Sequence, residues 1–439
     1  MRRIMKVILS ILLLGSGLSE SAYALSPDFH LGFESDFSRD VVTPSTFSIV
    51  KGGLNFETTN SSADLELKMS PIHPKVFAVS SKNAFYQITD ANTDDPSAFH
   101  FAFGRKWINW SQADEDWGLG AFNSLDSWDR LRSFSQGLTG IFIAADSNTF
   151  HFDIFASCLF LPEITPNVVI ENNHFEYFHP QAVSAGPEAI NLLNRATPLG
   201  YNLLIPSLSS IIFRPSLLLS VDTKKNIEPF YSKVSFGYLP LNYFPMALEA
   251  SLAIPIDQVV VDLRPRLLSH TLASAEVVYQ WNPELKSGLS VIRDQILPEN
   301  SLPTDYTTAT LGTTTYFSPW IKFKTMELSH IYSQGGIGAD VGPYANPNQN
   351  LFSSRILYRN ATQFKVSFFE LTGKFLHEYS INANWIALDW NHSWSSHWNS
   401  FVGGDVISAE YNAAPDGGAE FLSDLRALDR IRLGVNYVF

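Results

Sequence analysis

The carboxy-terminal residues 429–439 alternate between two kinds of side chain, and this alternation is the feature that most constrains the fold. Apolar residues take every second position: Ile431, Leu433, Val435, Tyr437 and Phe439. The positions between them hold Arg430, Arg432, Gly434, Asn436 and Val438. Successive side chains of a β-strand point to opposite faces. The segment therefore predicts a strand with one apolar face and one mostly polar face.

The same alternation recurs along most of the chain. From Phe29 onward, about twenty extended segments of about ten residues are separated by turn residues, and 246–254, 259–267 and 379–387 are examples. In lipid, both edges of every strand must be paired, which forces a sheet to close on itself. We therefore predict an all-β fold, a closed antiparallel transmembrane β-barrel with an even strand number of about 18, within a range of about 16 to 20.

The end of the chain resembles a known family. A terminal aromatic, Phe439, with Tyr437 two residues before it is similar to the carboxy-terminal signature of porin-like β-barrel proteins of Gram-negative outer membranes. The resemblance implies that Tyr437 and Phe439 are read by the barrel-assembly machinery, and that the protein lies in outer-membrane lipid. Residues 103–137 also resemble, loosely, a strand-to-loop pattern of several porin-like families, without distinguishing among them.

The amino-terminal residues predict a secretory signal peptide. Arg2, Arg3 and Lys6 precede an apolar run at 7–14, and Ala22 and Ala24 form a small-residue cleavage site. The alternative, a membrane anchor, would need about 20 apolar residues, more than this run contains. We therefore expect residues 1–24 to be removed and residues 25–439 to form one barrel domain.

Composition agrees with a surface that faces lipid. Charged residues make up 17% of the chain, against about 25% in soluble domains, while aromatic residues reach 13%. Tyr and Trp are typical of the belts where a barrel meets the membrane surface. The net charge of −13 excludes binding to nucleic acid through bulk charge. A single cysteine, Cys158, rules out an intramolecular disulfide.

Four long connections interrupt the strands, at 109–137, 161–208, 333–349 and 410–428. Long connections of such barrels lie on the external side and tight turns on the other. The segment 161–208 is rich in Leu and Ile for a solvated loop, and we expect it to fold into the barrel mouth and constrict it. The alternative is a structured external cap or a partner-binding surface.

Charged residues on the polar strand faces are the candidates for lining the lumen. They are Lys233, Glu249, Asp262, Arg264, Arg266, Lys365, Glu378, Arg430 and Arg432. Rings of charge in a lumen set ion preference, but both signs occur, so the preference stays open. These charges could also pair across strands and serve only to stabilise the wall.

Chemistry beyond transport has little support in the sequence. The acidic trio Asp114, Glu115 and Asp116 could hold a divalent cation, but it matches no EF-hand loop and is interpreted as a solvated loop. The histidines show no zinc-ligand spacing, and there is no nucleophile elbow or phosphate-binding loop. We therefore predict no catalytic residues, no metal and no cofactor.

The sequence as a whole predicts a porin or channel that passes small polar or amphipathic solutes by passive diffusion. Two alternatives stay open. One is a surface-exposed structural or adhesion barrel with a closed lumen, and the other is a barrel hydrolase. Oligomeric state and solute are not encoded in any motif of the sequence.

Overall fold

A computed structural model describes residues 28–39, 44–58, 60–71, 77–89, 99–165, 168–177, 189–192, 195–223, 229–253, 258–297, 312–335, 358–409 and 429–439. The predicted signal peptide with Ala22 and Ala24, the segment 410–428 and nearly all of 333–349 lie outside these residues.

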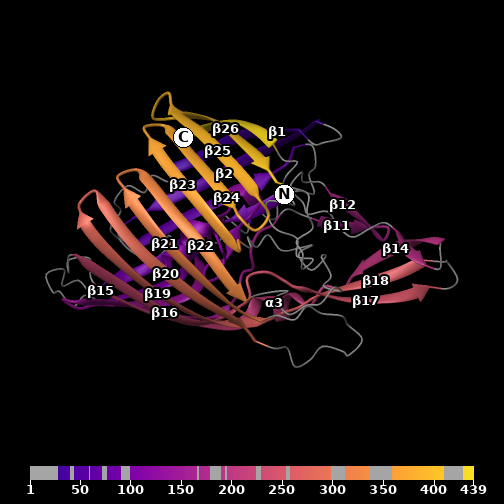
Figure 1. Cartoon of the computed structure of the whole chain (residues 1–439), viewed down its shortest axis with the longest axis horizontal. Coiled ribbons are helices and arrows are strands. Elements are labelled where there is room, and N and C mark those ends of the chain that lie inside the picture. Colours follow the sequence, from indigo (N-terminus) through magenta and orange to yellow (C-terminus); the bar gives the residue numbers. More distant parts are fainter. Residues whose placement is uncertain are drawn as a thin grey trace, which may run out of the picture.

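Nineteen strand segments form one antiparallel sheet (Figure 1). β4 and β5 both pair with β3 and together take one place in the wall, so the barrel has eighteen strands. They are β1 (Asp28–Arg39), β2 (Pro44–Glu57), β3 (Ser61–Met69), β4 (Phe77–Ser80) with β5 (Ala84–Thr89), β6 (Phe99–Lys106), β9 (Leu138–Asp146), β10 (Phe150–Leu159), β15 (Phe213–Thr223), β16 (Phe230–Pro240), β19 (Ser269–Asn282), β20 (Leu285–Ile296), β21 (Thr313–Phe323), β22 (Met326–Gly335), β23 (Asn360–Phe368), β24 (Leu371–Glu378), β25 (Ala383–Ser393), β26 (Trp398–Ser408) and β27 (Asp429–Val438).

The first and last strands close the ring. β1 pairs with β27 over ten residues, with Phe33 opposite Val435 and Asp36 opposite Arg432. Beyond the strand, the backbone N–H of Phe439 donates to the carbonyl of Phe29 at 2.8 Å. The prediction of a closed antiparallel barrel with an even strand number is therefore confirmed. Among the residues that the structure describes, no helix has the length and apolarity needed to cross a membrane.

The two faces of the wall differ as the alternation predicts. On β27, Ile431 is 57% exposed on the outside, whereas Arg430 next to it is 4% exposed on the inside. The same alternation runs through β10, β15 and β16, with Phe152, Leu219 and Phe236 outside. An apolar exterior and a polar interior are what a strand needs when lipid is on one side and a lumen on the other.

The connections differ at the two ends of the barrel. Short connections such as 147–149, 283–284 and 324–325 join strands at the end where the chain terminates, called here the turn end. Longer connections, including 107–137, 160–212 and 241–268, lie at the other end. The longest connections thus gather at one end of the barrel, as predicted, although 379–382 at that end is short and 90–98 at the turn end has nine residues.

The connections 160–212 and 241–268 build structure of their own outside the wall. β11 (Val168–Glu171) and β12 (His174–Tyr177) form a hairpin. β13 (Ala189–Leu192), β14 (Arg195–Leu203), β18 (Gln258–Pro265) and β17 (Met246–Ala253) form a four-stranded sheet, in which β14 and β18 are parallel. A short helix, α3 (Leu208–Ile212), leads back into β15, and Figure 1 shows the sheet extending to one side of the barrel.

The lipid-facing side of the wall gives a testable prediction. Leu433 is an outward residue near the middle of β27, so Leu433→Arg should lower the free energy of unfolding in liposomes by about 2–4 kcal/mol. Trp281→Arg is the control, since Trp281 is also exposed but lies at the turn end, where the expected cost is about 0–1 kcal/mol. Urea titrations followed by tryptophan fluorescence would compare the two. Equal losses would contradict this orientation of the wall.

Candidate functional site

The connection between β6 and β9, residues 107–137, runs through the interior of the barrel and is called here the lumen loop. It contains α2 (Gln112–Trp117), a 3-10 turn η1 (Arg130–Arg132), and two short paired strands, β7 (Leu125–Asp126) and β8 (Phe134–Ser135). Its Trp110, Trp117, Phe122 and Trp128 are at most 3% exposed. The loop is therefore as buried as a protein core.

A buried carboxylate gives the lumen loop its local shape. Asp114 lies in α2, and its two oxygens accept the backbone N–H groups of Ala121 and Phe122 at 2.8 and 2.9 Å. Between them, Gly118 ends the helix in the left-handed conformation, with φ 57°, where a side chain would be strained. These contacts turn the chain back on itself immediately after one and a half helical turns.

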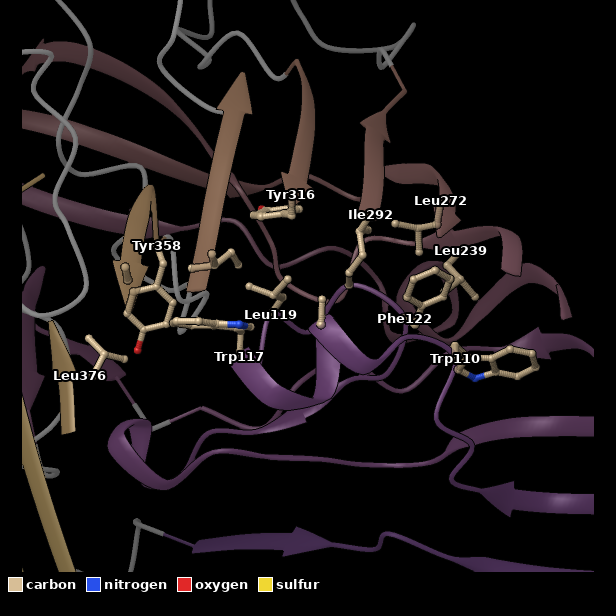
Figure 2. Close-up of a cluster of buried hydrophobic side chains, with 14 of the residues drawn as sticks. Trp110, Trp117, Leu119, Phe122, Leu239, Leu272, Ile292, Tyr316, Tyr358 and Leu376 are labelled. Atoms are coloured by element: carbon tan, nitrogen blue, oxygen red, sulfur yellow. The ribbon is translucent and has the colours of Figure 1, made fainter. Parts of the chain in front are cut away.

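Apolar side chains of the lumen loop pack on apolar side chains of the wall. Figure 2 shows Trp117, Leu119 and Phe122 of the loop facing wall residues from several strands. The wall residues labelled there are Leu239, Leu272, Ile292, Tyr316 and Leu376, together with Tyr358 just before β23. The Trp117 and Tyr358 rings meet edge to face with their centroids 5.3 Å apart. The loop and the inner wall thus share one hydrophobic core.

Small polar side chains on the inner wall leave room for the lumen loop and bind its backbone. Ser235 and Ser274 donate to the carbonyl of Trp110 at 2.8 and 3.4 Å. The Trp117 indole N–H donates to Ser318 Oγ at 3.0 Å. Just after β16, Asn242 donates to the Gly120 carbonyl. From other sides of the ring, Gln363 donates to the Asp116 carbonyl and Lys68 to the Asp126 carboxylate.

An ionic network joins the lumen loop to the closing seam of the barrel and is called here the arginine network. Arg430 contacts Asp129 and Asp405, each at 2.8 Å, and Asp36 at 3.4 Å. Arg132 of the loop binds Asp389 and also Asp405, the latter at 2.9 Å. Arg432 binds Asp389 at 2.5 Å and Glu34 at 3.5 Å. Three cations and five carboxylates therefore connect the loop to β1, β25, β26 and β27.

Burial changes the proton affinity of the acidic residues in α2. It raises the pKa of Asp114 to about 7, and nearby Glu115 adds to the rise, although the N–H donors of Ala121 and Phe122 oppose it. Burial likewise raises the pKa of Asp116 to about 6, against the opposing effect of the Lys365 ammonium. It also raises the pKa of Glu115. Asp114 is buried and Glu115 and Asp116 are half-buried in the lumen loop, so the trio is not the solvated loop that the sequence predicted.

A hollow of about 1100 Å³ lies between the lumen loop and the turn end. Asn109, Gln112 and Asp116 form its side toward the loop, while Pro229, Pro283 and Lys324 belong to the turn end. Its wall carries charges of both signs, among them Lys233, Lys286, Lys322, Glu276 and Glu327. A space with this lining suits water and polar solutes.

Five of the nine predicted lumen residues lie on the inner wall. Lys233 donates to the carbonyl of Asn109, and Lys365 donates to that of Asp116 at 3.1 Å. Glu378, 1% exposed, accepts from the Asn360 N–H and the Ser380 hydroxyl. Arg430 and Arg432 form the arginine network. Most of these charges are thus engaged with the loop or the wall, as the alternative interpretation allowed.

The other four residues do not lie on wall strands. Glu249, Asp262 and Arg264 belong to β17 and β18, which pair with each other and with β14 and not with a wall strand. Arg266 follows β18, where its backbone N–H donates to the Pro245 carbonyl. Because alternation arises in any half-buried strand, these segments imitated the wall. The count of eighteen wall strands lies within the predicted range of about 16 to 20, and β17 and β18 are not part of it.

The connection that runs through the interior is the lumen loop, and the expectation that 161–208 constricts the barrel is not met by the described part of that segment; residues 166–167, 178–188 and 193–194 lie outside the described residues. In the described part of 161–208, Glu163 and Ile164 run along the top of the lumen loop, where the Ser127 N–H donates to the Ile164 carbonyl at 2.7 Å. Of the strands that follow, β11 and β12 form a hairpin, and β13 and β14 belong to the four-stranded sheet outside the wall. Leu199 and Tyr201 are buried there against Val259 and Leu263.

The lumen loop itself carried a signal in the sequence. Residues 109–137 contain Trp110, Trp117, Leu119, Phe122, Leu125, Trp128 and Leu131, too many apolar residues for a solvated loop. The same excess of apolar residues is the reason why 161–208 was expected to fold into the barrel. A second signal is one inward serine on each of β16, β19, β20 and β21, since small inward residues leave space inside a barrel; they are Ser235, Ser274, Ser290 and Ser318.

At the carboxy terminus, the Tyr437 ring lies 4.7 Å from both the Phe439 and the Trp398 rings. The three aromatic side chains form a cluster on the outside of the turn end. Whether Tyr437 and Phe439 are read during assembly stays a prediction.

The chain is similar in fold to solved outer-membrane proteins. OccK2 (OpdF) of Pseudomonas aeruginosa has a TM-score of 0.48 and 7% identity, covering 95% of this chain and 98% of that one. OccAB3 of Acinetobacter baumannii has a TM-score of 0.46 and 9% identity, over 95% and 99% of the chains. OmpT of Vibrio cholerae has a TM-score of 0.36 and 10% identity, over 96% and 99%. No family model and no curated protein matches the chain.

The assignment of the fold depends on the wall itself. An antiparallel sheet that closes on itself, with apolar residues outside and polar residues inside, is the architecture that lets a β-protein span a lipid bilayer. The chain is therefore a closed, eighteen-stranded antiparallel β-barrel of the kind that spans a lipid bilayer.

The arginine network should make a large contribution to stability. Arg430→Ala leaves Asp36, Asp129 and Asp405 without their shared cation, and removing one partner of a buried ion pair costs about 3–5 kcal/mol. Lys324→Ala is the control, because it breaks an exposed pair with Glu284, worth about 0.2–1 kcal/mol. Unfolding in detergent micelles would measure both. A loss for Arg430→Ala no larger than the control would show that the network does not stabilise the fold.

Proposed function

We propose that the protein is a passive channel of the outer membrane for small polar or amphipathic solutes, and that the lumen loop forms the narrowest part of the path. The observation that supports this proposal most directly is that the lumen loop lies inside the barrel and is bound to strands on most sides of the ring. A barrel of eighteen strands is too wide for its own side chains to fill, so the occupant of the lumen decides what passes. A loop that fills only part of the lumen acts as a filter.

The lining of the hollow supports a polar solute. Charges of both signs project into it, and the Lys322 and Glu327 side chains lie 3.9 Å apart on adjacent strands. Such a lining offers donors and acceptors to replace the hydration that a solute loses at a constriction. In this proposal, transport needs no energy source, no cofactor and no catalytic step.

Single-channel recordings in planar bilayers test the proposal. The refolded mature chain should give small, stable conductance steps. The double variant D129A/R132A removes the loop side of the arginine network, so the loop should swing out and the steps should become several-fold larger and noisier. H392A is the matched control, because it removes an ion pair with Glu370 outside the lining of the hollow, and it should conduct like the unmodified chain. Insertion of the unmodified chain without conductance would contradict the proposal.

The pKa of Asp116 gives the channel a pH dependence. Asp116 lines the hollow, and burial raises its pKa to about 6. Its negative charge is therefore present at pH 7 and is lost by about pH 5. The cation-to-anion permeability ratio should decrease as the pH is lowered from about 7 to about 5. Reversal potentials in a salt gradient would measure the ratio. D116N should show a lower and flatter ratio across the window, and an unchanged titration in D116N would refute the assignment.

A second function is favoured by the sheet outside the wall. The sheet of β13, β14, β17 and β18 extends from the end of the barrel that carries the long connections, and β14 and β18 contribute an apolar cluster of their own. A folded platform at this place suits a surface protein that binds a partner while the lumen stays closed. A chain that inserts but does not conduct would favour this function.

A further inference from the structure

A histidine and two carboxylates converge on the wall of the hollow near the turn end. His151 and Asp153 are two residues apart on β10, so both point inward. Asp222 lies on the neighbouring strand β15, directly opposite His151 in the register. The strand pairing thus brings His151 and Asp153 next to Asp222, although His151 and Asp222 are 71 positions apart in the sequence.

The distances among these side chains suit a single metal ion. One possible ligand atom from each residue lies within 4.8 Å of the other two, and His151 Nε2 is 3.0 Å from Asp153 Oδ2. All three residues line the hollow, so an ion could reach them from its water. Three protein ligands leave at least one coordination position of the ion open to water, as in catalytic zinc sites.

A second carboxylate orients the histidine. Asp146, which pairs with His151 across β9 and β10, has its Oδ1 3.1 Å from His151 Nδ1. Metal-binding histidines commonly use their second ring nitrogen in this way, because the carboxylate fixes the tautomer and leaves the other nitrogen for the metal. Here the nitrogen that remains is Nε2, the one that faces Asp153.

The local charges leave room for a cation. Asp146, Asp153 and Asp222 carry three carboxylates into this part of the wall, and His100 lies 3.7 Å from Asp146. Lys233 stands opposite Asp222 on β16, but its ammonium donates to the Asn109 carbonyl of the lumen loop. Tyr231 and Glu276, also on the lining, add no positive charge.

We propose that His151, Asp153 and Asp222 bind a divalent transition-metal ion of the zinc type, with Asp146 as a positioning residue. One imidazole with two carboxylates is a donor set that such ions accept, whereas Ca²⁺ and Mg²⁺ take oxygen ligands only. The site would hold the ion in the hollow below the lumen loop, on the path of anything that crosses the barrel.

The test uses the refolded mature chain in detergent, freed of metal with EDTA and titrated with ZnCl₂ in a calorimeter. One zinc ion should bind per barrel. H151A, D153N and D222N should each weaken binding by more than the ~10–100-fold that loss of an outer-shell partner causes. H392A is the control, because His392 forms a comparable pair with Glu370, at 2.9 Å, on an exposed turn. It should leave the strong site unchanged.

Cobalt(II) absorption separates the ligands from the positioning residue. D146N should weaken binding by ~10-fold or more while the visible spectrum of bound Co²⁺ is kept, since its ligands are unchanged. H151A should alter the spectrum. The shift in apparent size on heating before gel electrophoresis verifies that each variant is folded, and the near-isosteric D222N serves where H151A does not fold.

Two results would overturn the proposal. The first is absence of zinc binding by the folded, unmodified chain, in which case His151 is an imidazolium paired with Asp146 and Asp153. The second is binding that survives in H151A and D222N. Neither result bears on transport, because channel conductance is recorded in EDTA without zinc.

Discussion

The pairing of backbone hydrogen-bonding groups is the constraint on which this structure depends. Lipid offers no partners for N–H and C=O groups, so the sheet has to close, and β1 has to meet β27. Closure at eighteen strands creates an interior larger than the inward side chains can fill. The lumen loop fills part of this interior, and the inward serines, leucines and arginines of the wall are shaped to receive it. The hydrophobic core of the protein is therefore the contact between a loop and a wall.

The wall was predictable because its signal repeats. A period of two over some ten residues, as in 429–439, reports which face meets lipid whether or not the neighbouring strand is known. The same signal could not separate β17 and β18 from the wall, because a sheet with one buried face has an identical pattern. Glu249, Asp262 and Arg264 were placed in the lumen for this reason. A wall strand and a strand of the outer sheet differ in the strands with which they pair. The alternation within one segment does not indicate which strand it pairs with.

The interior was less predictable, and the residues show why. Trp110, Trp117 and Phe122 gave a readable warning that 109–137 is buried, but the location of the burial follows from contacts with Ser235, Ser318 and other residues more than a hundred positions away. His151, Asp153 and Asp222 were overlooked for a related reason. Metal-site patterns assume ligands spaced along a helix or a turn, whereas these ligands meet across a strand register.

The arginine network has a consequence for the order in which the protein is built. Arg430 and Arg432 lie on the last strand to be synthesised, and their carboxylates lie on the first strand, on β25 and β26, and on the lumen loop. Until the seam closes, Asp129 and Arg132 of the loop have only part of their final partners. Because Arg430 binds both Asp36 of β1 and Asp129 of the lumen loop, closure of the ring and seating of this part of the loop depend on the same cation.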